Sequence, residues 1–315
     1  MARNPGDRPP GISRRNALRL LAAGAVGVMW RPGRAAPRPQ SMLQRPIPAS
    51  GELLPAIGLG TSRTFDVGAS PAERGPLREV LRRFIAYGGT LVDTSPMYGS
   101  AETVVGDLSA GLGVRRELFL ATKVWTSGRE AGIRQMQQSM RRLRSERLDL
   151  IQVHNLVDTD TQLATLRAWK EAGRVRYLGV THYHRGAYDE LERVLRRQPL
   201  DFVQLNYSLA ERDAAQRLLP LAAERRIAVI VNRPFARGSL FRRVRGRPLP
   251  QWCADFDCHS WAQLFLKYVL SHPAVTCAIP ATDKPRHLVD NMDAGYGRLP
   301  DRSQRRRMEQ LIDAL

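Results

Sequence analysis

The stretch LDLIQVHNLVDTDTQLATLRAWKEAGRVRYLGV, residues 148–180, contains two short apolar runs separated by a longer amphipathic segment. The apolar runs are 148–154 and 175–180, and the segment with helical periodicity between them is 162–172. This order is typical of a strand, a crossover helix and a second, parallel strand. The stretch therefore predicts one repeat of a parallel α/β fold.

The same alternation continues along most of the chain beyond residue 55. Strands are predicted at 57–61, 90–93, 118–124, 148–154, 175–180, 202–206, 227–232 and 275–279. Helices are predicted at 76–87, 101–112, 133–143, 162–172, 187–197, 213–225, 260–271 and 285–292. Eight strands alternating with eight helices predict an α/β fold of the (β/α)8 TIM-barrel type, built as a single domain.

A doubly wound sheet is the competing architecture, and it should carry a glycine-rich phosphate loop after its first strand. The corresponding residues, GLGTSR at 58–63, lack the third glycine and are not followed at once by a helical pattern. The barrel is therefore favoured. We also expect a short N-terminal hairpin around 51–55 that plugs the barrel bottom, and a lid over the catalytic face at 238–250.

The first forty residues differ in composition from the rest of the chain. They hold eight arginines against the single acidic residue Asp7, and the pair Arg14-Arg15 precedes an apolar run, 18–30, and the small residues Ala35-Ala36. This pattern predicts a twin-arginine export signal, so we expect a transient partner in the twin-arginine translocase and a periplasmic or exported protein. If the signal is not used, the protein is cytoplasmic. The predicted division is a signal and linker at 1–40 and a barrel at 41–315. The apolar run is short and interrupted by glycine, so no stable membrane span is expected.

The formal charge of +19 is carried almost entirely by arginine, since only four of the 49 basic residues are lysine. The arginines are spread over helical segments rather than gathered between aromatic residues, so we expect no nucleic-acid partner. Of the three cysteines, Cys253 and Cys258 lie in the run CADFDCH, which could hold a metal or a local disulfide. No second cluster of ligands accompanies them, so no metal site is expected.

Four polar residues lie at or just after the ends of three successive predicted strands, where barrel enzymes carry their chemistry. They are Asp93, Tyr98, Lys123 and His154. An ammonium beside a phenol favours the phenolate, so we expect Lys123 to lower the pKa of Tyr98 and Tyr98 to protonate a carbonyl oxygen. Asp93 would hold Lys123, and His154 would orient or polarise the carbonyl.

These residues belong to motifs that strongly resemble the aldo-keto reductases over residues 55–295. The motifs are LVDTSPMYG at 91–99, ATK at 121–123, DLIQVHN at 149–155, GRVRYLGV at 173–180, SHPAV at 271–275 and IPAT at 279–282. The resemblance implies a (β/α)8 barrel that uses NADPH to reduce a small carbonyl compound, with Asp93, Tyr98, Lys123 and His154 as the catalytic residues.

The resemblance also implies a set of residues that contact the cofactor and the substrate. Those at the nicotinamide are Thr181, His182 and Gln204; those near the pyrophosphate are Arg233, Phe235 and Arg237; those along the adenosine are Thr282, Lys284, His287, Asp290 and Asn291. Trp125, Phe65 and Tyr183 are candidate walls of the substrate pocket. His182 stands where the family commonly has asparagine, Asn232 where it has a stacking aromatic residue, and His287 where it has arginine. We therefore expect NADP(H), with NADH possible.

The sequence thus predicts an exported NADP(H)-dependent carbonyl reductase. The alternative is a non-catalytic cofactor-binding module that senses redox state or binds a partner, and the departures from the family pattern motivate it. The intact set of Asp93, Tyr98, Lys123 and His154 argues for the enzyme, because a module of that kind needs no Tyr98 beside Lys123. A metal-dependent hydrolase on the same barrel would need further ligands at other strand ends, and none is seen.

Overall fold

The computed structural model describes residues 41–315, and these contain a closed ring of parallel strands. The strands are β3 (Leu59–Gly60), β4 (Leu91–Asp93), β5 (Phe119–Val124), β6 (Leu148–His154), β7 (Val175–His182), β8 (Phe202–Asn206), β9 (Ala228–Asn232) and β10 (Val275–Ala278). Each strand pairs with the next in chain order. Parallel bridges from Ile57 to Ala278 and from Gly60 to Ala281 join the first strand to the last. The predicted (β/α)8 barrel is confirmed.

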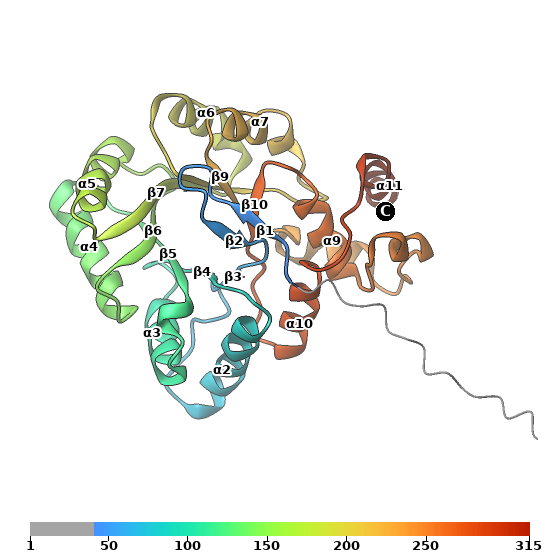
Figure 1. The fold of residues 1–315 in the computed structure, drawn as a ribbon, viewed down its shortest axis with the longest axis horizontal. Helices are drawn as coiled ribbons and strands as arrows, with labels where there is room; N and C mark the ends of the chain where they lie inside the picture. Colours follow the sequence, from blue (N-terminus) through green and yellow to red (C-terminus); the bar gives the residue numbers. More distant parts are fainter. Residues whose placement is uncertain (1–40) are drawn as a thin grey trace, which may run out of the picture. The chain divides into compact units, whose positions relative to one another are not determined.

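Helices surround this ring of strands (Figure 1). They are α2 (Pro71–Ala86), α3 (Ala101–Leu112), α4 (Arg129–Arg142), α5 (Thr159–Glu171), α6 (Tyr188–Arg197), α7 (Leu218–Glu224), α9 (Trp261–Leu270) and α10 (Pro285–Asp293). The bounds of β6, β8 and α3 are those predicted, and most others differ by a few residues. An apolar side of each helix packs on the strands and forms one continuous core between the two layers.

The start of α2 is a correction to the sequence prediction, which placed it at Pro76. The helix begins at Pro71, and the Ser70 hydroxyl caps it by accepting a hydrogen bond from the Glu73 amide at 3.3 Å. Proline suits the first helical position because its missing N–H would have no partner there. Both Pro71 and Pro76 fit a helix start by that rule, and Ser70 with Glu73 decides between them.

Two helical regions near the C-terminal half also differ from prediction. The segment predicted as one helix at 213–225 is a short 3-10 turn, η3 (Asp213–Ala215), followed by α7. A further helix, α11 (Arg302–Asp313), lies outside the predicted set, and Asp301 caps it. Contacts distant in sequence hold it against the barrel: the Arg305 guanidinium donates to the Tyr207 hydroxyl at 2.8 Å, and Met308 and Ile312 are buried in the core.

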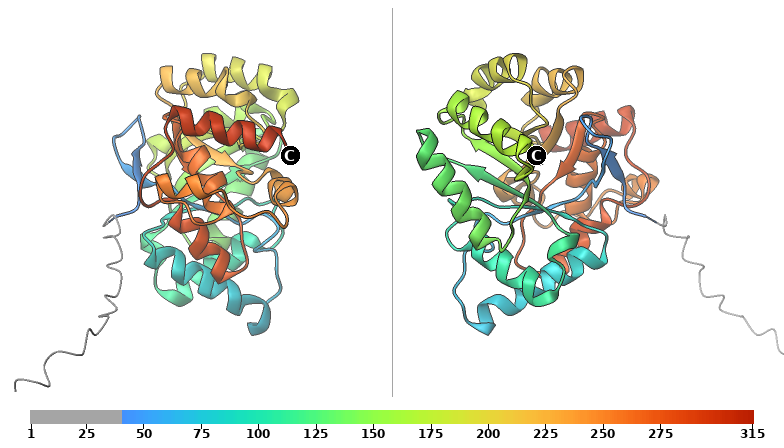
Figure 2. Two further views of the ribbon diagram at one scale, coloured as in Figure 1. Left: turned by 90° about the vertical axis from the view of Figure 1, so that its right-hand side faces the viewer. Right: turned by 60° about the vertical axis from the view of Figure 1, so that its left-hand side comes forward.

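A short hairpin lies at the end of the barrel where the strands begin, as Figure 2 shows at one side of the ring. It consists of β1 (Gln44–Pro46) and β2 (Leu53–Pro55), paired antiparallel. Its residues Ile47 and Leu54 are buried in a cluster that includes Phe119 from the start of β5. The predicted plug at the barrel bottom is confirmed, which leaves the opposite mouth, at the carboxyl ends of the strands, open for a site.

The predicted export signal at 1–40 lies outside the described residues. Among residues 41–315 no helix is both long enough and apolar enough to cross a membrane. The predicted lid segment at 238–250 contains the short helix α8 (Ser239–Arg243), followed by a connection that includes residues 246–250.

Gly106 permits the close approach of α3 and α4, and this generates a stability prediction. A Cβ added at Gly106 would lie 2.1 Å from the Arg142 carbonyl oxygen, whereas one added at Gly111, in the same helix, would meet nothing within 4 Å. Gly106→Ala should therefore lower the free energy of unfolding by about 1–3 kcal/mol through overpacking. Gly111→Ala should raise it by roughly 0.5–1 kcal/mol, because alanine favours the helix. Urea denaturation of both variants measures the difference, and equal effects would contradict the close packing.

Candidate active site

The four predicted catalytic residues converge at the mouth formed by the carboxyl ends of β4, β5 and β6. Asp93 ends β4, Tyr98 lies in the loop that follows it, Lys123 is the fifth residue of β5, and His154 ends β6. Register explains the convergence, because neighbouring parallel strands bring the same ends together.

A buried ion pair between Lys123 and Asp93 forms the floor of the site. The Lys123 Nζ lies 2.9 Å and 2.8 Å from the two Asp93 carboxylate oxygens and donates to the Thr94 carbonyl at 2.8 Å. Lys123 is fully buried and Asp93 is 2% exposed. Burial acts to lower the pKa of Lys123, but the charges and hydrogen bonds of Asp93 and Tyr98 together outweigh it, and the pKa of Lys123 is raised. Lys123 is therefore a fixed positive charge.

Tyr98 lies directly against that charge, with Lys123 Nζ 5.1 Å from the centroid of its ring. Burial raises the pKa of Tyr98, and the Lys123 ammonium only partly opposes this effect, while Asp93 adds to it. The expected fall in the pKa of Tyr98 is thus wrong in sign. Tyr98 stays protonated at neutral pH, so its hydroxyl is held ready to donate a proton.

His154 is neutral in this environment. Burial, assisted by the positive charge of Lys123, lowers the pKa of His154 to about 3. Its ring packs near Trp125 and Tyr183, each with a centroid separation of 6.5 Å. Its Nδ1 has no hydrogen-bond partner among the described residues. A neutral imidazole can donate one hydrogen bond to a carbonyl oxygen without competing with Tyr98 for the role of acid.

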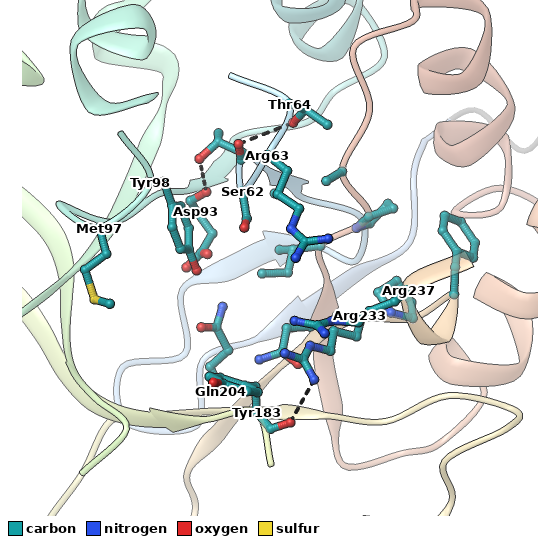
Figure 3. Close-up of a pocket in the computed structure, with 18 of the residues that line it drawn as sticks. Ser62, Arg63, Thr64, Asp93, Met97, Tyr98, Tyr183, Gln204, Arg233 and Arg237 are labelled. Atoms are coloured by element: carbon teal, nitrogen blue, oxygen red, sulfur yellow. Dashed lines mark hydrogen bonds between the residues drawn. The ribbon is translucent and has the colours of Figure 1, made fainter. Parts of the chain in front are cut away.

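A cavity of about 830 Å³ opens above these residues, and Asp93, Tyr98 and His154 line it. Figure 3 shows Asp93 and Tyr98 at this cavity. The size suits a dinucleotide end together with a small substrate. Of the predicted contacts, Gln204, Arg233, Phe235, Arg237, Trp125 and Tyr183 also line it. Of the ion pair at the floor, Asp93 lines the cavity directly, whereas Lys123 lies behind Asp93 and Tyr98 and is not part of the cavity wall.

Gln204 presents an unpaired donor to this cavity. The Thr181 hydroxyl donates to Gln204 Oε1 at 3.0 Å, and Gln204 Nε2 has no partner among residues 41–315. Thr181 is buried and orients Gln204 rather than lining the cavity. An unsatisfied buried amide is costly unless a ligand completes it. The arrangement fits an acceptor oxygen, such as that of the nicotinamide carboxamide.

Two asparagines, which the sequence motifs did not indicate as cofactor contacts, supply the complementary acceptors. Asn155 Oδ1 and Asn232 Oδ1 are both buried without partners in the described part of the chain, and both residues line the cavity. His182, by contrast, lies outside the cavity wall and uses its Nδ1 to accept from the His184 amide at 3.0 Å. Asn155, which follows His154 directly, presents a side-chain amide to the cavity, whereas His182 does not.

Three arginines surround the outer part of the cavity: Arg63, Arg233 and Arg237 (Figure 3). Arg233 lies 4.2 Å from the centroid of the Tyr183 ring and donates to the Tyr183 carbonyl at 3.1 Å. All three adopt positive φ angles, between 50° and 66°, a conformation that costs roughly 1–2 kcal/mol for a residue with a side chain. Strain of this kind gathers at functional sites. The sequence pointed to Arg233 and Arg237 but gave no signal for Arg63.

Two of the three residues predicted to form the wall of the substrate pocket line the cavity, and one does not. Trp125 and Tyr183 are 43% and 38% exposed, line the cavity, and each lie near the His154 ring. Phe65 is fully buried in the core and does not line the cavity, so its assignment was wrong. The Phe65 amide donates a hydrogen bond to the Thr61 carbonyl, and the Phe65 side chain in this turn lies inward. Phe241 of α8 lines the cavity instead, which places the predicted lid segment at its edge.

The predicted adenosine residues lie outside the cavity wall, in the loop before α10 and along that helix. Thr282 is buried and its hydroxyl accepts from the Lys284 amide at 3.1 Å, while Lys284 and His287 are exposed. Asn291 is buried on α10, and Asp290 accepts from the Ser260 hydroxyl at 2.9 Å. Lys284 thus stands at the N-terminal end of a helix, where positive partial charge adds to its own. The groups present suit a phosphate.

Among the described residues, no group of three or more histidine, cysteine and acidic side chains is placed to hold a metal. Cys253, Cys258 and Cys277 are free thiols and all are buried. The Cys253–His259 run lies in η5 (Gln251–Phe256) and the loop after it, outside the cavity wall.

Comparison with known proteins identifies the family of this chain. The model of the "Aldo/keto reductase family" matches residues 56–312. The chain belongs to the aldo-keto reductases. It is 31% identical over 261 residues to the methylglyoxal reductase YeaE of Escherichia coli, covering 79% of this chain and 89% of that protein.

Two solved aldo-keto reductase structures from Klebsiella pneumoniae are similar to the barrel. One, in complex with NADPH, has a TM-score of 0.72 at 26% identity and covers 86% of this chain and 96% of that one. The other, in complex with NADP and acetate, has a TM-score of 0.70 at 27% identity and covers 83% and 93%. The family model and these two structures extend the resemblance seen in the sequence motifs to the whole barrel.

His154 gives a testable pH dependence. The unfolded chain binds a proton at this histidine near pH 6.5, whereas the folded chain does so only near a pKa of about 3. Stability should therefore fall as the pH drops between these values, with a contribution of at most about 1.4 kcal/mol per pH unit. His154→Gln should flatten this slope, whereas the exposed His184→Gln serves as a control. Urea midpoints across the range test it, and an unchanged slope in His154→Gln would refute the buried neutral imidazole.

Proposed function

We propose that this protein is an NADP(H)-dependent carbonyl reductase in which Tyr98 is the proton donor. One observation carries the proposal: the buried Lys123–Asp93 pair lies against a protonated Tyr98 on the floor of a cavity that His154 also lines. A hydroxyl, a neutral imidazole and a fixed cation at one point suit the development of negative charge on a carbonyl oxygen.

The division of labour follows from the contacts. The nicotinamide cofactor, when bound, supplies the hydride. Tyr98 donates its proton to the carbonyl oxygen, and Lys123 stabilises the negative charge that Tyr98 acquires. Asp93 holds Lys123 in place. His154 donates a hydrogen bond to the same oxygen and orients the substrate, because its low pKa keeps it neutral.

The cofactor would lie from the cavity toward α10. Gln204 Nε2, Asn155 Oδ1 and Asn232 Oδ1 match the acceptor and donor atoms of a carboxamide. Arg237, with Phe235 beside it, would meet the pyrophosphate, since a guanidinium fork suits phosphate oxygens. Lys284 and His287, with Thr282 and Asn291 behind them, would receive the adenosine phosphate. The complexes of the two Klebsiella relatives with NADPH and with NADP support this choice of cofactor.

The substrate would be a small aldehyde or ketone held between Trp125 and Tyr183. These partly exposed aromatic side chains each lie near the His154 ring, so an apolar or planar group beside the carbonyl would pack against them. The similarity to a methylglyoxal reductase supports a small carbonyl compound.

Export is the second part of the proposal, and it rests on the pair Arg14-Arg15 ahead of an apolar run. The twin-arginine translocase would be the transient partner and the periplasm, or the exterior, the destination. A cofactor enzyme exported in this way would have to bind its nucleotide tightly enough to carry it along.

Replacing both signal arginines tests that part. Arg14→Lys with Arg15→Lys should leave the protein with the cytoplasmic fraction, while the matched pair Arg31→Lys with Arg34→Lys should not. Fractionation followed by immunoblotting measures it. Export of both double variants to the same extent would contradict the assignment of Arg14-Arg15 as part of an export signal.

Tyr98→Phe tests the chemistry. Removal of the hydroxyl that donates the proton should lower kcat for carbonyl reduction by about 10²–10⁴-fold, whereas NADPH binding should persist. Tyr183→Phe is the matched control, since it removes a hydroxyl from the cavity wall without touching Lys123. NADPH oxidation measured by absorbance gives both rates. Equal rates in wild type and Tyr98→Phe would exclude Tyr98 as the donor, and NADPH binding without turnover in the wild type would favour the redox-sensor alternative.

Lys284→Ala tests the choice between NADPH and NADH. Loss of one charge-assisted hydrogen bond to the adenosine phosphate should raise the Kd for NADPH about tenfold. The Kd for NADH should stay within twofold or so, because NADH lacks that phosphate. Fluorescence titration with both cofactors measures this, and a parallel loss for NADH would show that Lys284 does not read the phosphate.

A further inference from the structure

The run Cys253–Cys258 is folded into a compact helix end that brings its two cysteines together. The Cys258 amide donates to the Cys253 carbonyl at 3.1 Å, and the Asp257 amide donates to the Ala254 carbonyl at 3.1 Å. Asp257 has the left-handed conformation, with φ of 54° and ψ of 46°. These two bonds around a left-handed residue form a Schellman motif, in which the first and last residues usually make a hydrophobic side-chain contact. Here both of those positions are cysteine.

The backbone bond limits how far apart the two residues can be. From standard bond lengths and the 3.1 Å hydrogen bond, the Cα atoms of Cys253 and Cys258 are at most about 7 Å apart. Disulfides join residues whose Cα atoms lie up to about that distance. The Cα separation therefore permits a disulfide, and the hydrogen bond between the Cys253 and Cys258 side chains indicates that the two thiols face each other.

The two thiols differ in chemical character. A hydrogen bond with Cys258, together with burial, raises the pKa of the Cys253 thiol well above its ordinary value. The hydrogen bond from Cys253 lowers the pKa of Cys258, and the nearby Lys267 ammonium acts in the same direction. Lys267 is itself buried and donates to the carbonyls of Tyr296 at 2.6 Å and of Arg298 at 2.9 Å. Cys258 is thus the thiol of the pair that ionises more readily, and the thiolate is the form that attacks a disulfide.

Access to the pair requires a local opening of η5. Cys253 and Cys258 are buried, whereas Ala254 and Asp255 between them are exposed. Short 3-10 segments open with lower free energy than the strands of a core. Cys277, by contrast, lies on the strand β10 and is fully buried in the cluster inside the barrel.

We propose that Cys253 and Cys258 form a reversible dithiol–disulfide site that exchanges with small-molecule disulfides such as glutathione disulfide. The Cys258 thiolate attacks one sulfur of that disulfide, forming a mixed disulfide and releasing one glutathione thiolate. Cys253 then loses its proton and attacks the Cys258 sulfur, which releases the second glutathione as a thiol. The protein loses two hydrogens as its thiols are oxidised, and one glutathione disulfide is reduced to two glutathiones.

The position of the site gives the disulfide a structural consequence. The Cys258 thiol donates to the carbonyl of Ser260 at 3.5 Å, and Ser260 caps α9 and donates to Asp290 of α10 at 2.9 Å. Asp257, inside the motif, binds the Arg298 guanidinium at 2.9 Å. A disulfide between Cys253 and Cys258 fixes the turn that contains Asp257 and leads to Ser260. It therefore acts on the contacts of these two residues with Arg298 and Asp290.

Thiol counting at redox equilibrium tests the proposal on the full chain. Protein is equilibrated in a graded series of reduced to oxidised glutathione, quenched in acid, denatured, alkylated and weighed as whole protein and as peptides. We expect one cooperative loss of two alkylatable thiols, with the peptide holding Cys253 and Cys258 lighter by a pair of hydrogens and Cys277 still alkylated. Three alkylatable thiols at every ratio, or only intermolecular and glutathione-mixed disulfides, would overturn it.

Single variants test the predicted order of attack and do not depend on the disulfide forming. Cys253→Ser should stop at one glutathione on Cys258, and Cys258→Ser should react more slowly at Cys253 because the thiol that ionises more readily is absent. Cys277→Ala is the matched control and should form the Cys253–Cys258 disulfide as the wild type does. Circular dichroism establishes that each variant is folded before exchange begins. Equal rates at Cys253 and Cys258 would overturn the assignment of Cys258 as the attacking thiol.

Discussion

The active site depends on one buried ion pair. Lys123 is fully buried with its ammonium between the two carboxylate oxygens of Asp93, and breaking such a pair by removing one partner typically costs about 3–5 kcal/mol. The barrel makes the pair possible, because the register of β4 on β5 fixes both residues at one mouth. The Lys123 ammonium acts on the side chains above the pair. It helps to lower the pKa of His154, and it partly offsets the effect of burial on the pKa of Tyr98. The site is therefore a neutral acid and a neutral hydrogen-bond donor above a fixed cation.

The barrel itself could be predicted because its signal is local. Short apolar runs separated by amphipathic segments gave β6 and β8 with their observed bounds, and the hairpin followed from the apolar residues around Gly51. The failures have physical causes. Two prolines fit the start of α2 by the same rule. The sequence of α11 is polar and carries few apolar positions, such as Met308 and Ile312, and its contacts, such as that of Arg305 with Tyr207, join residues far apart in the chain.

The candidate site was predictable where residue type and strand end decide it, and less so where loops decide it. Asp93, Lys123 and His154 follow from strand ends, but Phe65 was misplaced because the inward turn of its loop has no sequence signal. Asn155 was missed because its value as an acceptor shows only when its oxygen is found buried without a partner among the described residues. The pKa of Tyr98 was given the wrong sign, since a sequence shows the neighbouring cation but not the extent of burial.

The central claim is that Tyr98 is held protonated beside Lys123, and its ionisation can be measured directly. The difference in tyrosinate absorbance between the wild type and Tyr98→Phe, followed against pH, isolates this one phenol from the other tyrosines. The account predicts that the difference appears only above the ordinary tyrosine pKa of 10.0, because burial outweighs the charge of Lys123. A difference that titrates below that value would contradict it, and would mean that Lys123 dominates and Tyr98 approaches a phenolate.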